Sequence, residues 1–190
     1  MSSFSLVLFA GGLGSRLRDS ESLPKPLVRI NGLSLVSRII LQFHSTGIFN
    51  EFVLLTCLDD SLFRSTVLSE LPDINIRFCN EENRSGRVGA LLNYINQSYS
   101  SKSFFIANAD TLFKSLTKSQ LLMPIQNLNS SYEPLVYLAE PDKSRDDYYA
   151  INTLESTSMQ NSGLSFISSE WLLSQTANHP SFTDTGEHFI

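Results

Sequence analysis

Residues 4–27 read FSLVLFAGGLGSRLRDSESLPKPL and contain a short apolar run, a cluster of glycines and a lysine between two prolines. The run over residues 4–10 is too short for a stable helix and ends at Gly11 and Gly12, which is typical of a buried strand. Glycines placed after a strand let the backbone turn tightly and bring its N–H groups against an anion. The stretch therefore predicts a buried strand followed by a loop suited to phosphate.

Apolar runs of similar length recur along the chain and alternate with segments of helical spacing. Further strands are predicted at residues 52–56, 74–78, 104–107 and 134–139. Apolar stripes with a spacing of three or four residues predict helices near Leu35, Leu91 and Leu121. Ser34 and Thr117 precede two of these helices as N-cap candidates. The alternation predicts an α/β fold, with a mostly parallel sheet covered by helices.

After residue 139 the pattern changes to shorter strand-like pieces, at residues 148–154 and 163–167, set among serine, threonine and asparagine. No linker, internal repeat or low-complexity block divides the chain. We therefore expect residues 1–190 to form a single domain, in which these pieces add strands at one edge of the same sheet.

The overall composition excludes several classes of protein. The chain has 190 residues, of which 42% are hydrophobic and 17% charged, as in one folded globular domain. Its net charge of -5 argues against nucleic-acid binding, which depends on many lysines and arginines. The chain lacks an apolar run near the ~18 residues of a membrane span and a stretch built like a secretory signal. We expect a cytoplasmic protein with no membrane or nucleic-acid partner, and reduced thiols at Cys57 and Cys79.

Lys25 lies between Pro24 and Pro26, which hold the chain in a stiff, extended stretch. Together with the loop amides and the guanidinium of Arg16, its ammonium group could bind a triphosphate. Two other interpretations of these residues stay open: a structural glycine turn, or a solvated basic patch. The loop matches neither the dinucleotide-binding fingerprint nor the P-loop pattern.

The longer stretch GGLGSRLRDSESLPKPLVRINGLSLVSRII, residues 11–40, resembles the signature of the sugar-1-phosphate nucleotidyltransferases. The resemblance is greatest to the small members that act on mannose or heptose 1-phosphates. It implies a Rossmann-like mixed, mostly parallel sheet flanked by helices. It also implies transfer of a nucleoside monophosphate from an NTP, with GTP favoured, to a sugar 1-phosphate, with Mg2+ as cofactor and pyrophosphate as the second product.

Carried over position by position, the resemblance makes Arg16 and Lys25 the catalytic cations at the triphosphate. The nucleotide-binding residues that it implies are Gly11, Gly12, Gly14, Ser15, Gly86 and Arg87. Residues 85–91 lie where relatives have a Gly-Thr-Gly-Gly-Ala turn beside the base. Val88 replaces a glycine of that turn, so the sequence leaves the identity of the base open.

Asn108-Ala109-Asp110 ends an apolar strand, and ligands of open α/β sheets bind at the carboxyl ends of strands. Asp110 is therefore a candidate Mg2+ ligand, unless it only caps the following turn. The resemblance implies that Asp110 is a catalytic metal ligand, and it indicates Asp184 as a second ligand. For two further acidic pairs, Asp59-Asp60 and Asp146-Asp147, we expect solvated turn residues.

The acceptor pocket is where the chain departs most from the family. The resemblance implies Asn108, Asn161 and Gly163 as acceptor-binding residues. Relatives also carry a Glu-Lys pair whose lysine meets the acceptor's phosphate, but this chain has no lysine after Lys143 and is shortened at that hairpin and at the C-terminus. Lys143 or Arg145 could replace the missing contact; otherwise we expect weak acceptor binding.

Two alternative functions stay open. The chain could be a non-catalytic, nucleotide-binding regulatory subunit of the same fold, or a cytidylyltransferase that acts on a non-sugar phosphate. The intact Gly11, Gly12, Arg16, Lys25 and Asp110 favour catalysis, because a purely structural descendant would not need all of them. The oligomeric state is uncertain from sequence, and we expect a monomer or a weak dimer.

Overall fold

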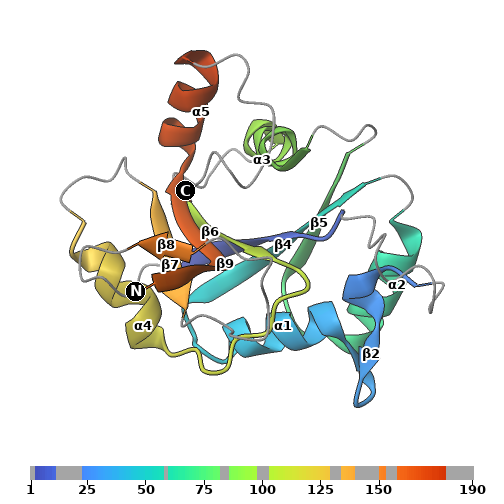
Figure 1. Cartoon of the computed structure of the whole chain (residues 1–190). Helices are drawn as coiled ribbons and strands as arrows, with labels where there is room; N and C mark the ends of the chain where they lie inside the picture. The colour runs from blue at the N-terminus through green and yellow to red at the C-terminus, as the bar shows by residue number, and fades with distance from the viewer. Residues whose placement is uncertain are drawn as a thin grey trace.

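The computed structural model describes residues 3–11, 23–57, 60–81, 86–97, 103–128, 134–139, 150–152 and 158–178. Within these ranges, seven strands form one sheet with helices on both of its faces (Figure 1). The strands are β1 (Phe4–Phe9), β4 (Phe49–Cys57), β5 (Ile76–Glu81), β6 (Ser103–Asn108), β7 (Leu135–Ala139), β8 (Ala150–Asn152) and β9 (Ser158–Ser168). The helices are α1 (Leu35–His44), α2 (Ser61–Glu70), α3 (Gly86–Gln97), α4 (Lys118–Gln126) and α5 (Ser169–Asn178), with a short 3-10 helix, η2 (Lys25–Leu27).

The strand order is β5-β4-β1-β6-β9-β7, and β8 pairs with β9. The first four strands of this order are parallel, whereas β9 runs antiparallel to β6, β7 and β8. This confirms the predicted fold class, a mixed and mostly parallel α/β sheet. The pieces after residue 139 join the sheet beyond β6, as expected. However, the antiparallel β9 lies between β6 and β7, so β7 runs in the same direction as β6 but does not pair with it.

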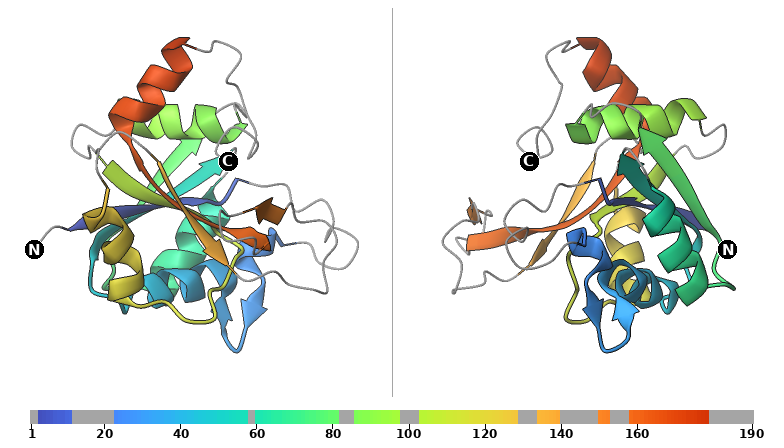
Figure 2. Two further views of the ribbon diagram at one scale, coloured as in Figure 1. Left: turned by 60° about the vertical axis from the view of Figure 1, so that its left-hand side comes forward. Right: turned by 90° about the vertical axis from the view of Figure 1, so that its right-hand side faces the viewer.

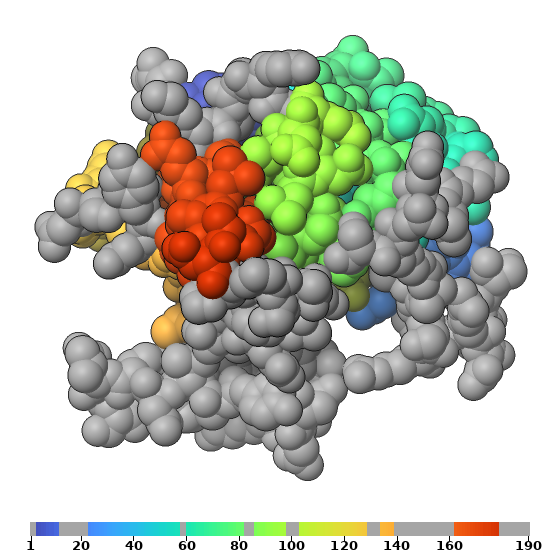
Figure 3. All heavy atoms as spheres, turned by 90° about the horizontal axis from the view of Figure 1, so that it is seen from above, coloured from blue at the N-terminus to red at the C-terminus, as the bar shows by residue number. Residues whose placement is uncertain are grey.

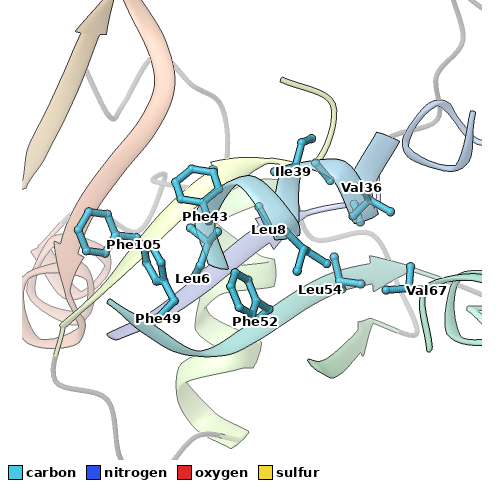
Figure 4. Close-up of a cluster of buried hydrophobic side chains, with 14 of the residues drawn as sticks. Leu6, Leu8, Val36, Ile39, Phe43, Phe49, Phe52, Leu54, Val67 and Phe105 are labelled. Atoms are coloured by element: carbon cyan, nitrogen blue, oxygen red, sulfur yellow. The ribbon is translucent and has the colours of Figure 1, made fainter. Parts of the chain in front are cut away.

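Two hydrophobic cores lie on opposite faces of the sheet (Figures 1 and 2). On one face, α1 and α2 pack against β1, β4 and β6, and Figure 4 shows the Phe43, Phe49 and Phe52 rings of this larger core. On the other face, α3 and α5 lie side by side over the sheet (Figure 3). Because successive residues of a strand point to opposite faces, Leu6 and Leu8 belong to the first core and Val7 to the second.

The helix starts that the sequence predicted are confirmed by their caps. The Ser34 hydroxyl accepts a hydrogen bond from the Ser37 N–H at the start of α1. Thr117 and Gln120 form a reciprocal capping box at the start of α4. Such caps satisfy N–H groups that have no partner inside the helix.

Two helices were not predicted, and several boundaries differ. The buried residues of α2 are only Phe63 and Val67, and that of α5 is only Leu172, so neither helix carries a clear apolar stripe. The strand predicted at 74–78 is β5 and begins two residues later. The strand predicted at 163–167 is part of the longer β9. No helix in the described part of the chain is both long and apolar enough to cross a membrane.

The segment that carries Lys25 is the short 3-10 helix η2, not the extended stretch predicted from the two prolines, and it is anchored to α1. Leu27 is buried in the larger core, and its N–H donates to the Pro24 carbonyl at 2.8 Å. A hairpin follows, formed by β2 (Arg29–Ile30) and β3 (Leu33–Ser34). Its turn is Asn31-Gly32, where both residues have positive φ, and Arg38 of α1 donates to the carbonyl of Asn31. The lysine therefore extends from a fixed backbone.

The buried carboxylate of Glu70 connects α2 to the start of α1. One of its oxygens accepts hydrogen bonds from the N–H and the hydroxyl of Ser34, at 3.0 and 2.6 Å. The other lies 3.4 Å from the Arg29 guanidinium. Burial alone would raise the pKa of Glu70, but the hydrogen bonds from Ser34 and Ser37 and the charge of Arg29 outweigh it, so the pKa is lowered. The ionised carboxylate is therefore the form that stabilises the fold.

We expect Glu70→Gln to lower the free energy of unfolding by about 1.5–3 kcal/mol at neutral pH, since hydrogen bonds to a charged group are lost. Because the pKa of Glu70 is lowered on folding, the carboxylate stabilises the folded state above the unfolded value of about 4.3, and this contribution is lost as the pH falls from there through the lower pKa of the folded state. The difference between variant and wild type should therefore be smaller at about pH 3 than at neutral pH. Urea titrations at both pH values test this, and an equal difference at both would show that the charge is not responsible.

Candidate active site

The candidate site lies at the carboxyl ends of β1, β4 and β6. Phe9 at the end of β1 pairs with Asn108 at the end of β6, and the Ala109 N–H donates to the Phe9 carbonyl at 3.1 Å. On the other side of β1, the Ala10 N–H donates to the Leu55 carbonyl of β4 at 2.9 Å. The chain therefore leaves all three strands at one edge, where ligands of open α/β sheets bind.

Lys25 and Asp110 form an ion pair at this edge. The Lys25 ammonium lies 2.8 Å from a carboxylate oxygen of Asp110, and their side chains are 42% and 35% exposed. The Thr111 hydroxyl lies 3.4 Å from the other carboxylate oxygen. The structure thus brings together two residues that the sequence predicted as a catalytic cation and a metal ligand, from positions far apart in the chain.

The loop after Asp110 is fixed to α1 through Gln42. The Gln42 amide donates to the Phe113 carbonyl and accepts from the Phe113 N–H at 3.1 Å. The Phe113 ring packs edge-on against Phe43, with 5.4 Å between ring centroids. Helix α1 therefore supports the Asp110 loop as well as the Lys25 segment.

Gly11, the first glycine of the predicted loop, lies against Cys57 at the end of β4. The Cys57 thiol donates to the Gly11 carbonyl at 3.1 Å. A Cβ at Gly11 would lie 3.3 Å from the Cys57 sulfur, tighter than an ordinary contact. The close approach of the segment after β1 to the end of β4 accounts for a glycine at position 11. This role of Cys57 was not predicted, although its place directly after an apolar run indicates the edge of the sheet.

Arg87 in the first turn of α3 connects the second predicted turn to the end of β6. Its guanidinium donates to the side-chain oxygen of Asn108 at 2.9 Å and lies over the Phe9 ring, 5.3 Å from the centroid. Gly163 of β9 lies beside the Asn108 amide nitrogen, only 2.8 Å from where a Cβ would stand. Val88, expected beside the base, is instead buried in the core under α3. Its replacement of glycine therefore serves packing.

Part of the predicted site lies outside the described residues. This holds for Gly12, Gly14, Ser15, Arg16 and Asp184, and for Lys143 and Arg145. Of the predicted residues that are described, Asn161 is placed by its backbone in β9, opposite Leu138. The remaining ones, Gly11, Lys25, Gly86, Arg87, Asn108, Asp110 and Gly163, lie on the elements that meet at this edge.

Asp110 also determines what metal the edge could hold. Within the described ranges, no three histidine, cysteine or acidic side chains come together as a metal site. A single carboxylate nevertheless fits Mg2+, which often takes one or two carboxylates and completes its shell with water and substrate phosphates.

The expectation that Asp60 is a solvated turn residue is wrong. Asp60 is buried before α2, where it accepts hydrogen bonds from the Thr56 hydroxyl at 3.2 Å and from Arg64 at 2.9 Å. Burial of a carboxylate requires such partners. The side chain therefore supports the junction between β4 and α2.

The fold and the residues at its edge define the class of the protein. Residues 6–173 match the MobA-like NTP transferase domain, and the chain belongs to that family. This confirms the nucleotidyltransferase resemblance found in the sequence. A comparison with curated protein sequences gave no match.

Three solved structures illustrate the shared fold. HddC from Yersinia pseudotuberculosis, also solved as a complex with GMP-PN, is 21% identical with a TM-score of 0.73, over 88% of this chain and 77% of its own. The inositol-1-phosphate CTP transferase from T. maritima is 16% identical with a TM-score of 0.74, and the match covers 100% of this chain and 80% of that protein. A UDP-glucose pyrophosphorylase complexed with UDP-glucose is 13% identical with a TM-score of 0.69, and the match covers 92% of this chain and 80% of that protein. At these identities the likeness confirms the fold.

We expect Gly163→Ala to disturb Asn108, and Gly47→Ala to serve as its matched control. Both glycines have positive φ, 77° and 70°, so each alanine should lower the free energy of unfolding by about 1–2 kcal/mol. Only at Gly163 does the new Cβ meet the Asn108 amide, whereas nothing lies within 4 Å at Gly47. NMR spectra should show shifted Asn108 side-chain amide signals in Gly163→Ala alone. Unchanged signals would contradict the contact.

Proposed function

We propose that this protein transfers a nucleoside monophosphate from an NTP to a sugar 1-phosphate and releases pyrophosphate. The proposal combines membership of the NTP transferase family with one observation, the ion pair of Lys25 and Asp110 at the carboxyl edge of the sheet. A partly exposed ion pair contributes at most about 1 kcal/mol to stability. Stability alone is therefore a weak reason to hold a lysine between two prolines and aim it at a carboxylate.

The reaction requires little of the protein beyond charge and position. An oxygen of the sugar phosphate attacks the α-phosphorus of the NTP, and the bond to the bridging oxygen breaks as pyrophosphate leaves. A phosphate monoester has a second pKa of about 6, so the attacking oxygen is already charged at neutral pH and no general base is needed. Lys25 is proposed to offset the negative charge that develops on the phosphates.

In this proposal Asp110 is the residue that holds Mg2+, with Asp184 as its partner ligand. The bound ion would offset charge on the phosphates and align them. Lys25 and Asp110 would then part, each towards its own ligand. The Gln42–Phe113 bonds hold the Asp110 loop in place for this exchange. The backbone amides at Gly11, Gly12 and Gly14, with Ser15 and Arg16, are proposed to bind the triphosphate, and Gly86 to lie beside the base.

GTP is the proposed nucleotide, and its support is the likeness to HddC, which was solved with GMP-PN. A cytidylyltransferase is the second candidate. Its support is the likeness to the inositol-1-phosphate CTP transferase and to 4-diphosphocytidyl-2C-methyl-D-erythritol synthase from Anaerococcus prevotii, which is 11% identical with a TM-score of 0.65.

A pyrophosphate-release assay with the four NTPs and a panel of phosphorylated acceptors tests the proposal. The panel should contain mannose, heptose and glucose 1-phosphates together with inositol 1-phosphate and methylerythritol phosphate. Release with GTP and a sugar 1-phosphate is the expected result, and release with CTP and a non-sugar phosphate would favour the second candidate. Nucleotide binding without release in any combination would identify a non-catalytic, nucleotide-binding protein.

We expect Lys25→Ala to lower turnover by about 100-fold or more, because removal of one preorganised charge donor typically costs about 10²–10³ in rate. The fold should be unaffected, since Lys25 is 42% exposed. Lys118→Ala removes an exposed lysine at the start of α4 and serves as the control. Near-normal pyrophosphate release by Lys25→Ala would contradict its placement at the phosphates.

For Asp110→Asn we expect loss of Mg2+-dependent turnover, because a neutral amide is a much poorer ligand for a hard cation than a carboxylate. The control Asp73→Asn changes an exposed aspartate in the turn before β5. Rates measured across a Mg2+ titration separate the two variants. If Asp110→Asn keeps its rate at ordinary Mg2+, the metal must be held elsewhere. Asp184→Asn should act in the same direction.

A further inference from the structure

We propose that Arg87 and Asn108 form the binding point for the phosphate of the acceptor substrate. This inference rests on the proposed function and assigns one of its two anions to named side chains. Four separate elements meet at this place: the first turn of α3, the ends of β1 and β6, and Gly163 of β9. The Phe9 ring and the Asn108 oxygen hold the guanidinium from two sides.

The proposed reaction brings together two anions, the NTP and the phosphate of the acceptor. The Arg87–Asn108 pair lies where the acceptor's phosphate could meet an NTP bound at Lys25 and Asp110. Asn108 and Asp110 are two residues apart, so their Cα atoms are separated by at most about 7 Å. Reacting atoms must approach to about 3–3.5 Å. A phosphate on Arg87 and Asn108 would therefore lie within reach of a nucleotide held at Lys25 and Asp110.

The two cations reach the edge from opposite faces of the sheet. Two residues after Lys25, Leu27 is buried in the larger core with α1, whereas Val88, directly after Arg87, is buried in the core under α3. Each cation thus has its own buried anchor in the next residues of the chain. Two anions that repel each other need this arrangement, with one positive group on each side of the reacting atoms.

The chemistry of the Arg87–Asn108 pair selects for a hydrogen-bond acceptor. A guanidinium has only donors, in a planar fork that matches phosphate. Because the Asn108 oxygen accepts from Arg87, the side chain is oriented with its amide nitrogen, a donor, towards Gly163. The glycine leaves the space that this nitrogen needs. A phosphate oxygen is the matching partner for groups of this kind, whereas a hydrogen-bond donor on a ligand is not.

The test is direct binding, which does not depend on turnover. Calorimetry measures the affinity of α-D-mannose 1-phosphate and of inorganic phosphate, with and without Mg2+ and a nonhydrolysable GTP analogue. Arg87→Met keeps an unbranched apolar stem against Phe9 but removes the charge. Since a charge-assisted contact contributes about 1.5–3 kcal/mol, we expect binding of both probes to weaken by roughly 10- to 150-fold.

Two further variants and a control make the result specific. Arg87→Lys should recover part of the affinity, and Asn108→Asp should weaken phosphate binding although its carboxylate can still accept from Arg87. Arg77→Met removes an arginine that lies over the Tyr94 ring, 5.2 Å from its centroid, and should change nothing at the site. In turnover assays of Arg87→Met, KM for the acceptor should rise while KM for the NTP stays constant.

Three outcomes would overturn the inference: unchanged probe affinity in Arg87→Met, no measurable binding of either probe to the wild type, or weakened nucleotide binding instead. The last would assign Arg87 to the nucleotide. Failure of the proposed function looks different, because the probes would then bind in an Arg87-dependent way while the wild type released no pyrophosphate.

Discussion

The parallel pairing of β1 with β4 and β6 is the constraint on which the rest of the structure depends. Leu6 and Val7 are completely buried, one on each face, so β1 separates and supports both cores. Backbone hydrogen bonds continue past its end, from Ala10 to Leu55 and from Ala109 to Phe9. Because the three strands are parallel, the polar groups that follow them must emerge at the same edge.

Features that depend on a few neighbouring residues could be predicted from the sequence. An apolar run that ends at glycines was sufficient for β1, and a serine or threonine before an apolar stripe was sufficient for α1 and α4. Helices α2 and α5 could not be predicted, since each is held by one or two buried residues rather than by a periodic face. The burial of Asp60 could not be predicted for a related reason. It depends on how β4 and α2 pack at their junction, where Arg64 donates to the carboxylate, and the local pattern of residues does not show this packing.

In the candidate site, too, single residues could be predicted from the sequence but their pairings could not. The resemblance named Lys25, Asp110 and Arg87 one by one, but their partners come from distant parts of the chain. Lys25 and Asp110 are 85 residues apart, and Arg87 and Asn108 are 21 apart. Such pairs follow from the crossover connections between parallel strands, which carry no signal at the residues themselves. The roles of Cys57 and Val88, which support the edge through close contact and burial, are likewise products of packing.

The attraction between Lys25 and Asp110 is weak, as expected for two side chains that must leave each other when a charged ligand binds. Both side chains are more than a third exposed, so water screens their attraction and separating them costs about 1 kcal/mol at most. A fully buried pair would resist separation by several kcal/mol, because each charge would be left without a partner. The backbone on either side is rigid by contrast, with Leu27 buried and Phe113 bonded to Gln42. Binding of a charged ligand can therefore redirect two side chains without moving the chain that carries them.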